Sequence, residues 1–344
     1  MERKKNKTMK LTEQIEKEYG NITSQTVIQN TFNSSVEKII DAFKIYLDGL
    51  VYDHGQYSLR ISDAYKAILK STKGLYSKED ITQFSTGLES FFSHRESYDK
   101  PYDKSSTGIF LTELISLHYK KNRWKRFVKR IGSFWKEKKI DEYVLLLQEY
   151  GKNIDEFGFQ LNGPSIRIIG DIGEFCGREM KKGKITIEGN AMGYCGYHLK
   201  GGEIIVTGNT EDHLGSYMEG GTIFVRGNTE NDLAESMQGG KIFVYGNAKS
   251  RIGCNMDGGE VTIFGNAEDH IGHFMTGGKI TIVGSSGFFT GVTMEYGTIL
   301  VKNNPEVTND YKNQKAKLLI NGIEHSYEIE HPNEKENSHL KGKK

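Results

Sequence analysis

Cysteine, proline, net charge and long apolar runs are all scarce in this 344-residue chain. Its three cysteines, Cys176, Cys195 and Cys254, are too few for a disulfide framework or for an iron–sulfur cluster held by four cysteines of this chain. No run of about 18 apolar residues could form a membrane-spanning helix, and no apolar stretch follows the basic start as a signal peptide requires. The 46 basic and 45 acidic residues balance, which gives no overall charge argument for a nucleic-acid or anionic-membrane partner. We therefore expect a cytoplasmic protein.

Glycine, by contrast, is abundant and concentrated in one region. Of the 40 glycines, 29 lie between Gly163 and Asn304. Within this region a segment of the form Gly-x-Ile-x-Val-x-Gly-Asn recurs every 19 residues without insertion or deletion. Its eight copies begin at Pro164, Gly183, Gly202, Gly221, Gly240, Gly259, Gly278 and Gly297. A fixed period of this length is typical of a solenoid, in which each unit buries its apolar face against its neighbours.

The residues inside one unit predict its local structure. The third and fifth positions are β-branched in every copy, for example Ile185 and Ile187, which predicts a short strand with one buried face. The Gly-Asn pair that follows in most copies permits a turn, because both residues tolerate left-handed backbone. A later column is mostly methionine: Met218, Met237, Met256 and Met275. We therefore expect a single-stranded parallel β-helix of about eight 19-residue coils, stacked roughly 4.8 Å apart.

The repeat resembles a known family. The Gly…Ile-x-Val-x-Gly-Asn units, and closures such as Gly215–Gly221 and Gly272–Gly278, are similar to the GXGXG repeats. This family includes the C-terminal domain of the glutamate synthase large subunit and one of the subunits of formylmethanofuran dehydrogenase. Over residues 159–304 the resemblance implies a right-handed β-helix that acts as a structural spacer. The chain contains neither the glutaminase domain with its N-terminal cysteine nor the flavin and iron–sulfur barrel that carry the chemistry of glutamate synthase.

The flanking regions have a different character. Residues 1–158 predict a helical domain, with helices over Ser34–Leu50, from Ser77, over Phe110–His118 and over Ile140–Tyr150. The predicted fold class is thus α+β with two domains. Residues 305–344 contain a hairpin signal at Asn321 and Gly322. We expect this hairpin to cap the last coil and the residues after it to form a polar, disordered tail.

One segment of the helical region is strongly basic. Lys120–Lys139 holds ten Lys and Arg residues against one acid, Glu137, with both tryptophans of the chain on one helical stripe. Its candidate partner-binding residues are Lys121, Arg123, Trp124, Lys125, Arg126, Lys129 and Arg130. An ordinary helix with a solvated basic face is the favoured interpretation, followed by a protein-binding site and then by contact with nucleic acid or membrane.

The repeat region also contains candidate polar sites, and a structural role is favoured for each. The column Asn190, Asn209, Asn228, Asn247 and Asn266 predicts a hydrogen-bonded ladder along the axis. Cys176 and Cys195 share a column in adjacent coils, where small buried thiols are expected. The Glu-Asp-His triplets ending at His213 and His270 stand three coils apart, roughly 14 Å, which excludes one shared metal. Asp269, His270 and His273 form the one compact polar cluster, with little to indicate catalysis.

These observations favour a protein without its own chemistry. The leading hypothesis is a non-catalytic β-helix subunit or scaffold of a larger oxidoreductase or amidotransferase-type assembly. No cofactor is predicted in this chain, and a partner chain would carry flavin, iron–sulfur or a molybdenum or tungsten cofactor. Two alternatives remain: an enzyme with its site where the helical domain meets the β-helix, and a nucleic-acid or membrane adaptor acting through residues 120–139.

Overall fold

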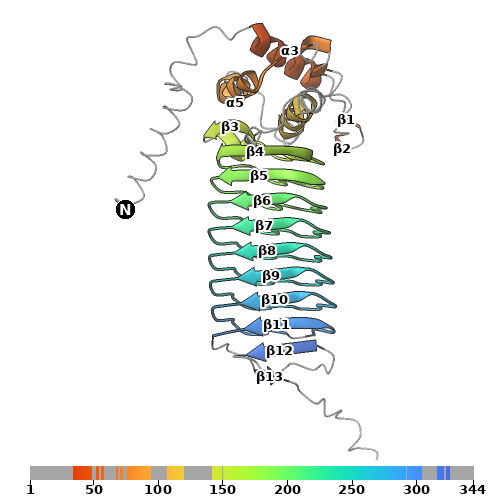
Figure 1. The fold of residues 1–344 in the computed structure, drawn as a ribbon, viewed down its shortest axis with the longest axis vertical. Coiled ribbons are helices and arrows are strands. Elements are labelled where there is room, and N and C mark those ends of the chain that lie inside the picture. The colour runs from red at the N-terminus through yellow and green to blue at the C-terminus, as the bar shows by residue number, and fades with distance from the viewer. Residues whose placement is uncertain are drawn as a thin grey trace, which may run out of the picture.

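The computed structural model of the protein is an elongated solenoid with helices at one end (Figure 1). It describes residues 34–48, 52–53, 56–57, 67–68, 70–72, 76–93, 107–119, 142–148, 150–291, 293–303, 316–320 and 323–325. Its described elements before the solenoid include α3 (Ser34–Asp48), the β1 (Tyr52–Asp53) and β2 (Gln56–Tyr57) pair, α5 (Lys78–Ser93) and a helix over residues 107–119.

The repeat region forms a parallel β-solenoid of about eight turns, as the 19-residue period predicts. Each strand pairs with the equivalent residues of the next coil, as Lys184 does with Glu203 and Ile185 with Ile204. The repeat strands are β4 (Asn162–Gly170), β5 (Lys182–Glu188), β6 (Glu203–Val206), β7 (Thr222–Val225), β8 (Lys241–Val244), β9 (Glu260–Ile263), β10 (Lys279–Ile282) and β11 (Gly297–Val301). A second contact line of single parallel bridges runs from Ile172 through Ala191 and Thr210 to Ala267. The coils are thus joined on two sides.

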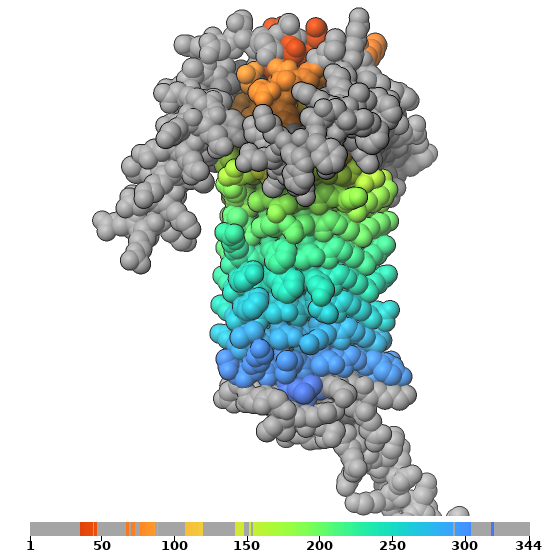
Figure 2. Space-filling view, viewed as in Figure 1, coloured from red at the N-terminus to blue at the C-terminus, as the bar shows by residue number. Residues whose placement is uncertain are grey.

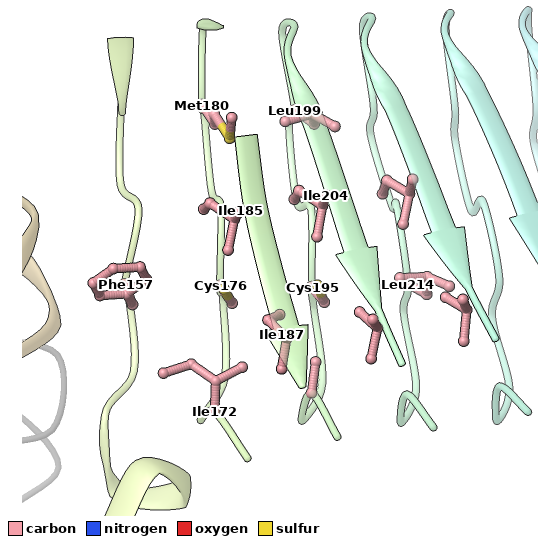
Figure 3. Close-up of a cluster of buried hydrophobic side chains, with 14 of the residues drawn as sticks. Phe157, Ile172, Cys176, Met180, Ile185, Ile187, Cys195, Leu199, Ile204 and Leu214 are labelled. Carbon is pink, nitrogen blue, oxygen red and sulfur yellow. The ribbon is translucent and has the colours of Figure 1, made fainter. Parts of the chain in front are cut away.

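Apolar columns fill the interior of the solenoid. The two β-branched positions of each strand point inward, and Figure 3 shows Ile185 and Ile187 facing the Cys176 column across the coil. Met180, Leu199 and the methionines from Met218 to Met275 are fully buried in a further column. Each apolar side chain contributes about 1.5–3 kcal/mol when removed from water, so stacking stabilises coils that could not fold singly.

The parallel sheet begins earlier than residue 159. The helix expected over Ile140–Tyr150 is wrong, because β3 (Glu142–Gln148) is a strand that pairs in parallel with β4. Tyr143, Leu145 and Leu147 point into the core, while Val144 and Leu146 on the other side are half-buried or buried as well. A strand covered on both sides has a continuous apolar sequence, which does not distinguish it from a helix. A short 3₁₀ helix, η1 (Tyr150–Asn153), follows it.

Helix α5 covers the open edge of β3. Its start is a capping box, in which the Ser77 N–H donates to Asp80 Oδ2 (2.7 Å) and the Asp80 N–H donates to Ser77 Oγ (3.1 Å). One face of the helix then lies along the strand, where Thr82 Oγ1 donates to the Val144 carbonyl at 2.7 Å and Lys78 Nζ to the Glu142 carbonyl at 3.2 Å. These side chains satisfy backbone groups that would otherwise attract another strand.

The described helices share one core with the solenoid. Phe43 of α3 packs on Phe110 of the helix over residues 107–119, with ring centroids 4.9 Å apart. That helix meets the first coil, because Thr112 Oγ1 accepts the Gly158 N–H at 2.8 Å. Buried side chains form one continuous cluster from Val36 to Leu318. The described helical segments therefore serve as a cap on the N-terminal end of the solenoid.

A hairpin covers the opposite end. Strand β12 (Ala316–Ile320) pairs in parallel with β11, and β13 (Ile323–His325) folds back antiparallel on β12. Leu318 is fully buried against the last coil. Among the described residues the sheet thus has eleven strands, in the order β13 to β3. The remainder of the predicted tail lies outside the described residues.

Candidate functional site

The turns opposite the sheet have an unusual and regularly repeated backbone. In one coil Phe175, Gly177 and Glu179 all have positive φ, and the equivalent residues of the following coils repeat this pattern. Left-handed backbone disfavours residues that carry a Cβ, so the surrounding structure must hold it. Ladder hydrogen bonds do so: the Tyr194 N–H donates to the Asp212 carbonyl at 3.0 Å and the Gly196 N–H to the Cys176 carbonyl at 2.8 Å. The turns therefore present their side chains on a fixed frame.

The first left-handed position of each turn forms a column of stacked groups. Phe175 stacks on Tyr194 with ring centroids 4.6 Å apart, and Tyr194 stacks on His213 at 4.4 Å. The next two coils place Asp232 and Arg251 there, and Arg251 Nε donates to Asp232 Oδ1 at 2.6 Å. Along this column, three coils therefore carry stacked rings and the next two carry an ion pair.

Two neighbouring columns widen the ring surface. Tyr197 meets Tyr194 and Tyr217 edge-on, with ring centroids 5.9 and 5.5 Å apart, and His198 stacks on Tyr217 at 5.1 Å. All these side chains are half-buried. The aromatic platform is defined here as Phe175, Tyr194, Tyr197, His198, His213 and Tyr217. It spans three consecutive coils.

Carboxylates surround the platform. Glu235 Oε2 lies 3.1 Å from His213 Nδ1, and Glu219 Oε1 lies 3.5 Å from His198 Nδ1. The pKa of Tyr194 is raised mainly by burial, and the negative charges of Glu235 and Glu174 raise it further. Ring systems next to carboxylates attract cations, both through the ring quadrupole and through charge-assisted hydrogen bonds. The chemistry of this surface therefore suits a lysine or arginine side chain.

A buried carboxyl stands at the N-terminal end of the same column. Glu156 is 6% exposed, and burial raises its pKa to about 7 despite the opposing effect of Arg178. Its Oε1 accepts from Arg178 Nη1 at 2.5 Å, whereas Oε2 has no hydrogen-bond partner among the described residues. The Arg178 guanidinium also lies over the Phe159 ring, 4.7 Å from its centroid. This carboxyl can hold or release a proton near neutral pH.

The junction between the cap and the first coil carries polar contacts of its own. His118 Nδ1 lies 2.8 Å from the Tyr143 hydroxyl, and Lys78 Nζ lies 4.8 Å from the centre of the Tyr143 ring. The Tyr76 hydroxyl donates to the Leu114 carbonyl at 2.9 Å, and burial raises the pKa of that hydroxyl far above its usual value. These groups join β3 to the helices that cover it.

The asparagine column runs along another corner. The backbone N–H of Asn209 donates to Asn190 Oδ1 at 2.8 Å, and the same bond recurs in the following coils up to Asn266. A Cβ at Gly208 would lie 2.4 Å from Asn190 Oδ1, which explains the glycine before each asparagine. The asparagine side chains of this column thus hydrogen-bond to the backbone of the next coil, as the predicted ladder requires.

Glycine, asparagine and inward Ile and Val recur in this geometry every 19 residues. Residues 187–342 match the GXGXG motif family. The match supports the right-handed winding that the resemblance implies. No curated protein matches the chain. None of the described helices is long and apolar enough to cross a membrane.

The solenoid places the predicted polar cluster on the turn surface near its C-terminal end. The rings of His270 and His273 are 6.3 Å apart, and burial, followed by the His270 charge, lowers the pKa of His273. Asp269 Oδ1 accepts the Phe288 N–H at 2.7 Å, so this carboxylate holds the next turn. It also lines a surface cavity of about 460 Å³ together with Glu268, Ser285 and Ser286. Within the described part of the chain, no three His, Cys, Asp or Glu residues could hold a metal ion.

The two triplet histidines lie in the same turn column, three coils apart. His213 belongs to the aromatic platform, and His270 stacks on Phe289 at 4.8 Å. Cys176 and Cys195 are buried free thiols. The basic segment 120–139, including Lys121, Arg123, Trp124, Lys125, Arg126, Lys129 and Arg130, lies outside the described residues.

The sequence analysis did not predict the aromatic platform. Its residues share columns at a spacing of 19, as Phe175, Tyr194 and His213 do. Aligning the eight units by their turns, and not only by their strands, brings these rings into register. The signal is weakened because Asp232 and Arg251 interrupt the column.

Proposed function

We propose that this protein is a rigid, non-catalytic GXGXG subunit that binds another protein within a larger assembly of the oxidoreductase or amidotransferase kind. The observation that carries the proposal is the aromatic platform with its carboxylates, held on a solenoid whose interior is filled mostly by apolar side chains. A filled interior offers a stiff support. The side chains proposed to contact the partner belong to the turns.

The platform points to the chemistry of the partner. Half-buried rings lose little conformational entropy on binding, which is why tyrosine is frequent in interfaces. Glu219 and Glu235 attract Lys and Arg side chains, and such contacts weaken as salt rises. The partner is therefore a chain with a basic, exposed surface. Flavin, iron–sulfur or a molybdenum or tungsten cofactor belongs to that chain in this proposal.

Purification from the native cells tests the proposal. The tagged full chain is isolated at low and at high salt, its partners are identified by mass spectrometry, and a visible absorption spectrum is recorded. We expect a stoichiometric partner with a coloured cofactor, released as salt rises. A colourless chain without a partner at low salt would overturn the subunit role. Recovery of nucleic acid or lipid alone would favour the adaptor function of residues 120–139.

A paired variant assigns the interaction to the platform. Tyr197→Ser with Tyr217→Ser removes two rings, and both replacements have precedents in the chain, because Ser216 and Ser236 occupy the same columns one coil on. We expect at least a tenfold loss of partner with the melting temperature retained. The matched control is Phe274→Ser, which removes a 50% exposed ring from the Tyr217 column three coils away. Equal loss in both proteins would contradict the assignment to the platform.

A further inference from the structure

The outer face of the sheet carries a second aromatic surface, separate from the turns. Phe224 stacks on Phe243 with ring centroids 5.1 Å apart, and Tyr245 stacks on Phe264 at 4.8 Å. Tyr245 is 53% exposed and Phe264 42% exposed. These four residues are called the sheet-face patch. In Figure 2 the surface of the middle coils is open to solvent. Contiguous exposed apolar surface of this kind usually marks an interaction site.

The strands that carry the patch form a regular plane. From β5 to β11 every strand pairs with the next without a register shift, and Figure 1 shows them stacked in a straight column. Three outward positions per strand therefore form three straight rows. The row beside the patch contains Glu203 on β6, Lys241 on β8, Glu260 on β9 and Lys279 on β10.

These rows match a second copy of themselves. If two sheets face each other about a two-fold axis parallel to the strands and passing between β8 and β9, then β8 lies opposite the β9 of the other copy. Lys241 then faces Glu260, and Tyr245 faces Phe264, twice by symmetry. One strand further out, Phe224 faces Thr281. The aromatic rings thus form one four-membered cluster beside two ion pairs.

Neighbouring registers are worse. Moving the axis onto β8 brings Lys241 opposite the second Lys241, and moving it onto β9 brings Glu260 opposite the second Glu260. Moving it between β7 and β8 places Glu203 opposite Glu260. Like charges at short range oppose association.

Moving the axis between β9 and β10 does pair Glu260 with Lys279. It also places Phe264 opposite Val283 and moves Tyr245 away from the rings of the other copy. The proposed register is therefore the one that both avoids like charges and joins the rings.

We infer that the sheet face binds a second copy of this chain in that register, forming a two-fold symmetric dimer. Six facing strands at about 4.8 Å, each with three outward residues about 6.7 Å apart, cover roughly 500–600 Å² per copy. The total, about 1,000–1,200 Å², lies at the lower end of specific interfaces. The dimer is accordingly reversible, with dissociation in the micromolar range. This inference goes beyond the proposed function, because the dimer needs no other protein.

Sedimentation of the purified full chain tests the inference. We expect wild-type protein to change from monomer to dimer between about 1 and 100 µM. Lys241→Glu and Glu260→Lys should each weaken the dimer at least tenfold, because each places four like charges together. Both side chains are more than half exposed, 53% and 54%, so the variants should fold, which a thermal melt verifies.

Mixing the two variants separates this dimer from any other interaction. In an equimolar mixture, one copy carries glutamate at both positions 241 and 260 and the other copy carries lysine at both. Both facing pairs are then oppositely charged, so the heterodimer should form with an affinity near that of the wild type.

Glu203→Lys is the control, since it breaks the equivalent Lys184–Glu203 pair (2.8 Å) but faces Thr298 of the second copy. It should leave the dimer intact. A wild-type chain that stays monomeric at about 100 µM, single variants that still dimerise, or a mixture that stays monomeric would each overturn the inference.

Discussion

At the residue scale, one column shows how tightly neighbouring coils fit. A Cβ at Gly215 would lie 2.4 Å from Ile242 Cδ1, and most glycines of this column in other coils meet an isoleucine in the same way. Ala234 is the exception in this column, with φ of 59°. The residue that follows it by the same spacing is Val261, which has no Cδ1. An added methyl group on one coil is matched by a lost methyl group on another, as close packing requires.

Restoring the isoleucine alone should therefore disturb the core. We expect Val261→Ile to lower the free energy of unfolding by about 1–3 kcal/mol, because its Cδ1 collides with the Ala234 Cβ. In the Ala234→Gly background the same change should be neutral or favourable. Urea unfolding of the two single variants and the double variant measures the coupling. Equal losses in both backgrounds would contradict the proposed contact.

Glu156 should make the stability of the fold depend on pH. Its pKa is about 7 in the folded protein against 4.5 for an unperturbed carboxyl, so the folded state binds the proton more tightly. Stability is then fully present below about pH 4.5 and falls as the pH rises through 7. Glu156→Gln, which imitates the protonated form, should add about 1–3 kcal/mol at about pH 8 and change little at about pH 4.

Urea unfolding at several pH values between about 4 and 8 measures the difference. The control is Glu179→Gln, which changes a more exposed carboxylate one coil away, 28% exposed by its side chain. A Glu156→Gln variant whose stability has the same slope with pH as the wild type would show that another group is responsible.

At the element scale, the decisive contact is the helix that closes the first strand. Helix α5 places Lys78, Thr82 and Ser85 on one face, and all three bond to the backbone of β3. The spacing follows from the helical period, which brings residues three and four apart to the same side. An amphipathic helix here covers both apolar surface and unpaired peptide groups.

Removing one hydroxyl should expose this role. Thr82→Val leaves the Val144 carbonyl without its 2.7 Å bond, and we expect a loss of about 1–2 kcal/mol. Hydrogen exchange should quicken in β3 before the later strands. Thr86→Val is the control on the same helix, because the Thr86 hydroxyl bonds to Gln83 of its own helix. Similar effects of the two substitutions would indicate a change in helix propensity instead.

At the scale of the whole molecule, a parallel solenoid has two open ends, and this chain covers both. The helices cover β3, and the β12–β13 hairpin covers β11. A flat, uncovered parallel edge is a template for further strands. The length of the rod and its solubility therefore depend on segments that do not belong to the repeat.

Deleting the C-terminal hairpin tests this dependence. A chain that ends at Asn304 should melt at a lower temperature and form larger aggregates, because β11 loses its partner and the cover of Leu318. A chain that ends at His331 retains both hairpin strands and is the control. Light scattering during a thermal ramp measures the difference. A truncated chain as soluble and as stable as the control would show that the hairpin is dispensable.

The solenoid could be predicted from the residue pattern alone, because the pattern is repeated. Each inward position is occupied by the same kind of residue in every coil, as Ile185, Ile204 and Ile223 are, so one residue pattern is tested many times. The buried strand, the glycine turn and the asparagine ladder all follow from such columns. The start of the helix at Ser77 could also be read locally, because a capping box involves only residues close together in the sequence.

Features that do not repeat along the chain could be assigned only from the three-dimensional packing. β3 lacks the repeat, and its assignment as a strand depends on α5 and on the first coil, which lie far away in the sequence. The platform and the sheet-face patch likewise depend on which turns and faces stay uncovered. A residue pattern specifies which side chains share a row, whereas their exposure is set by everything else that packs in three dimensions.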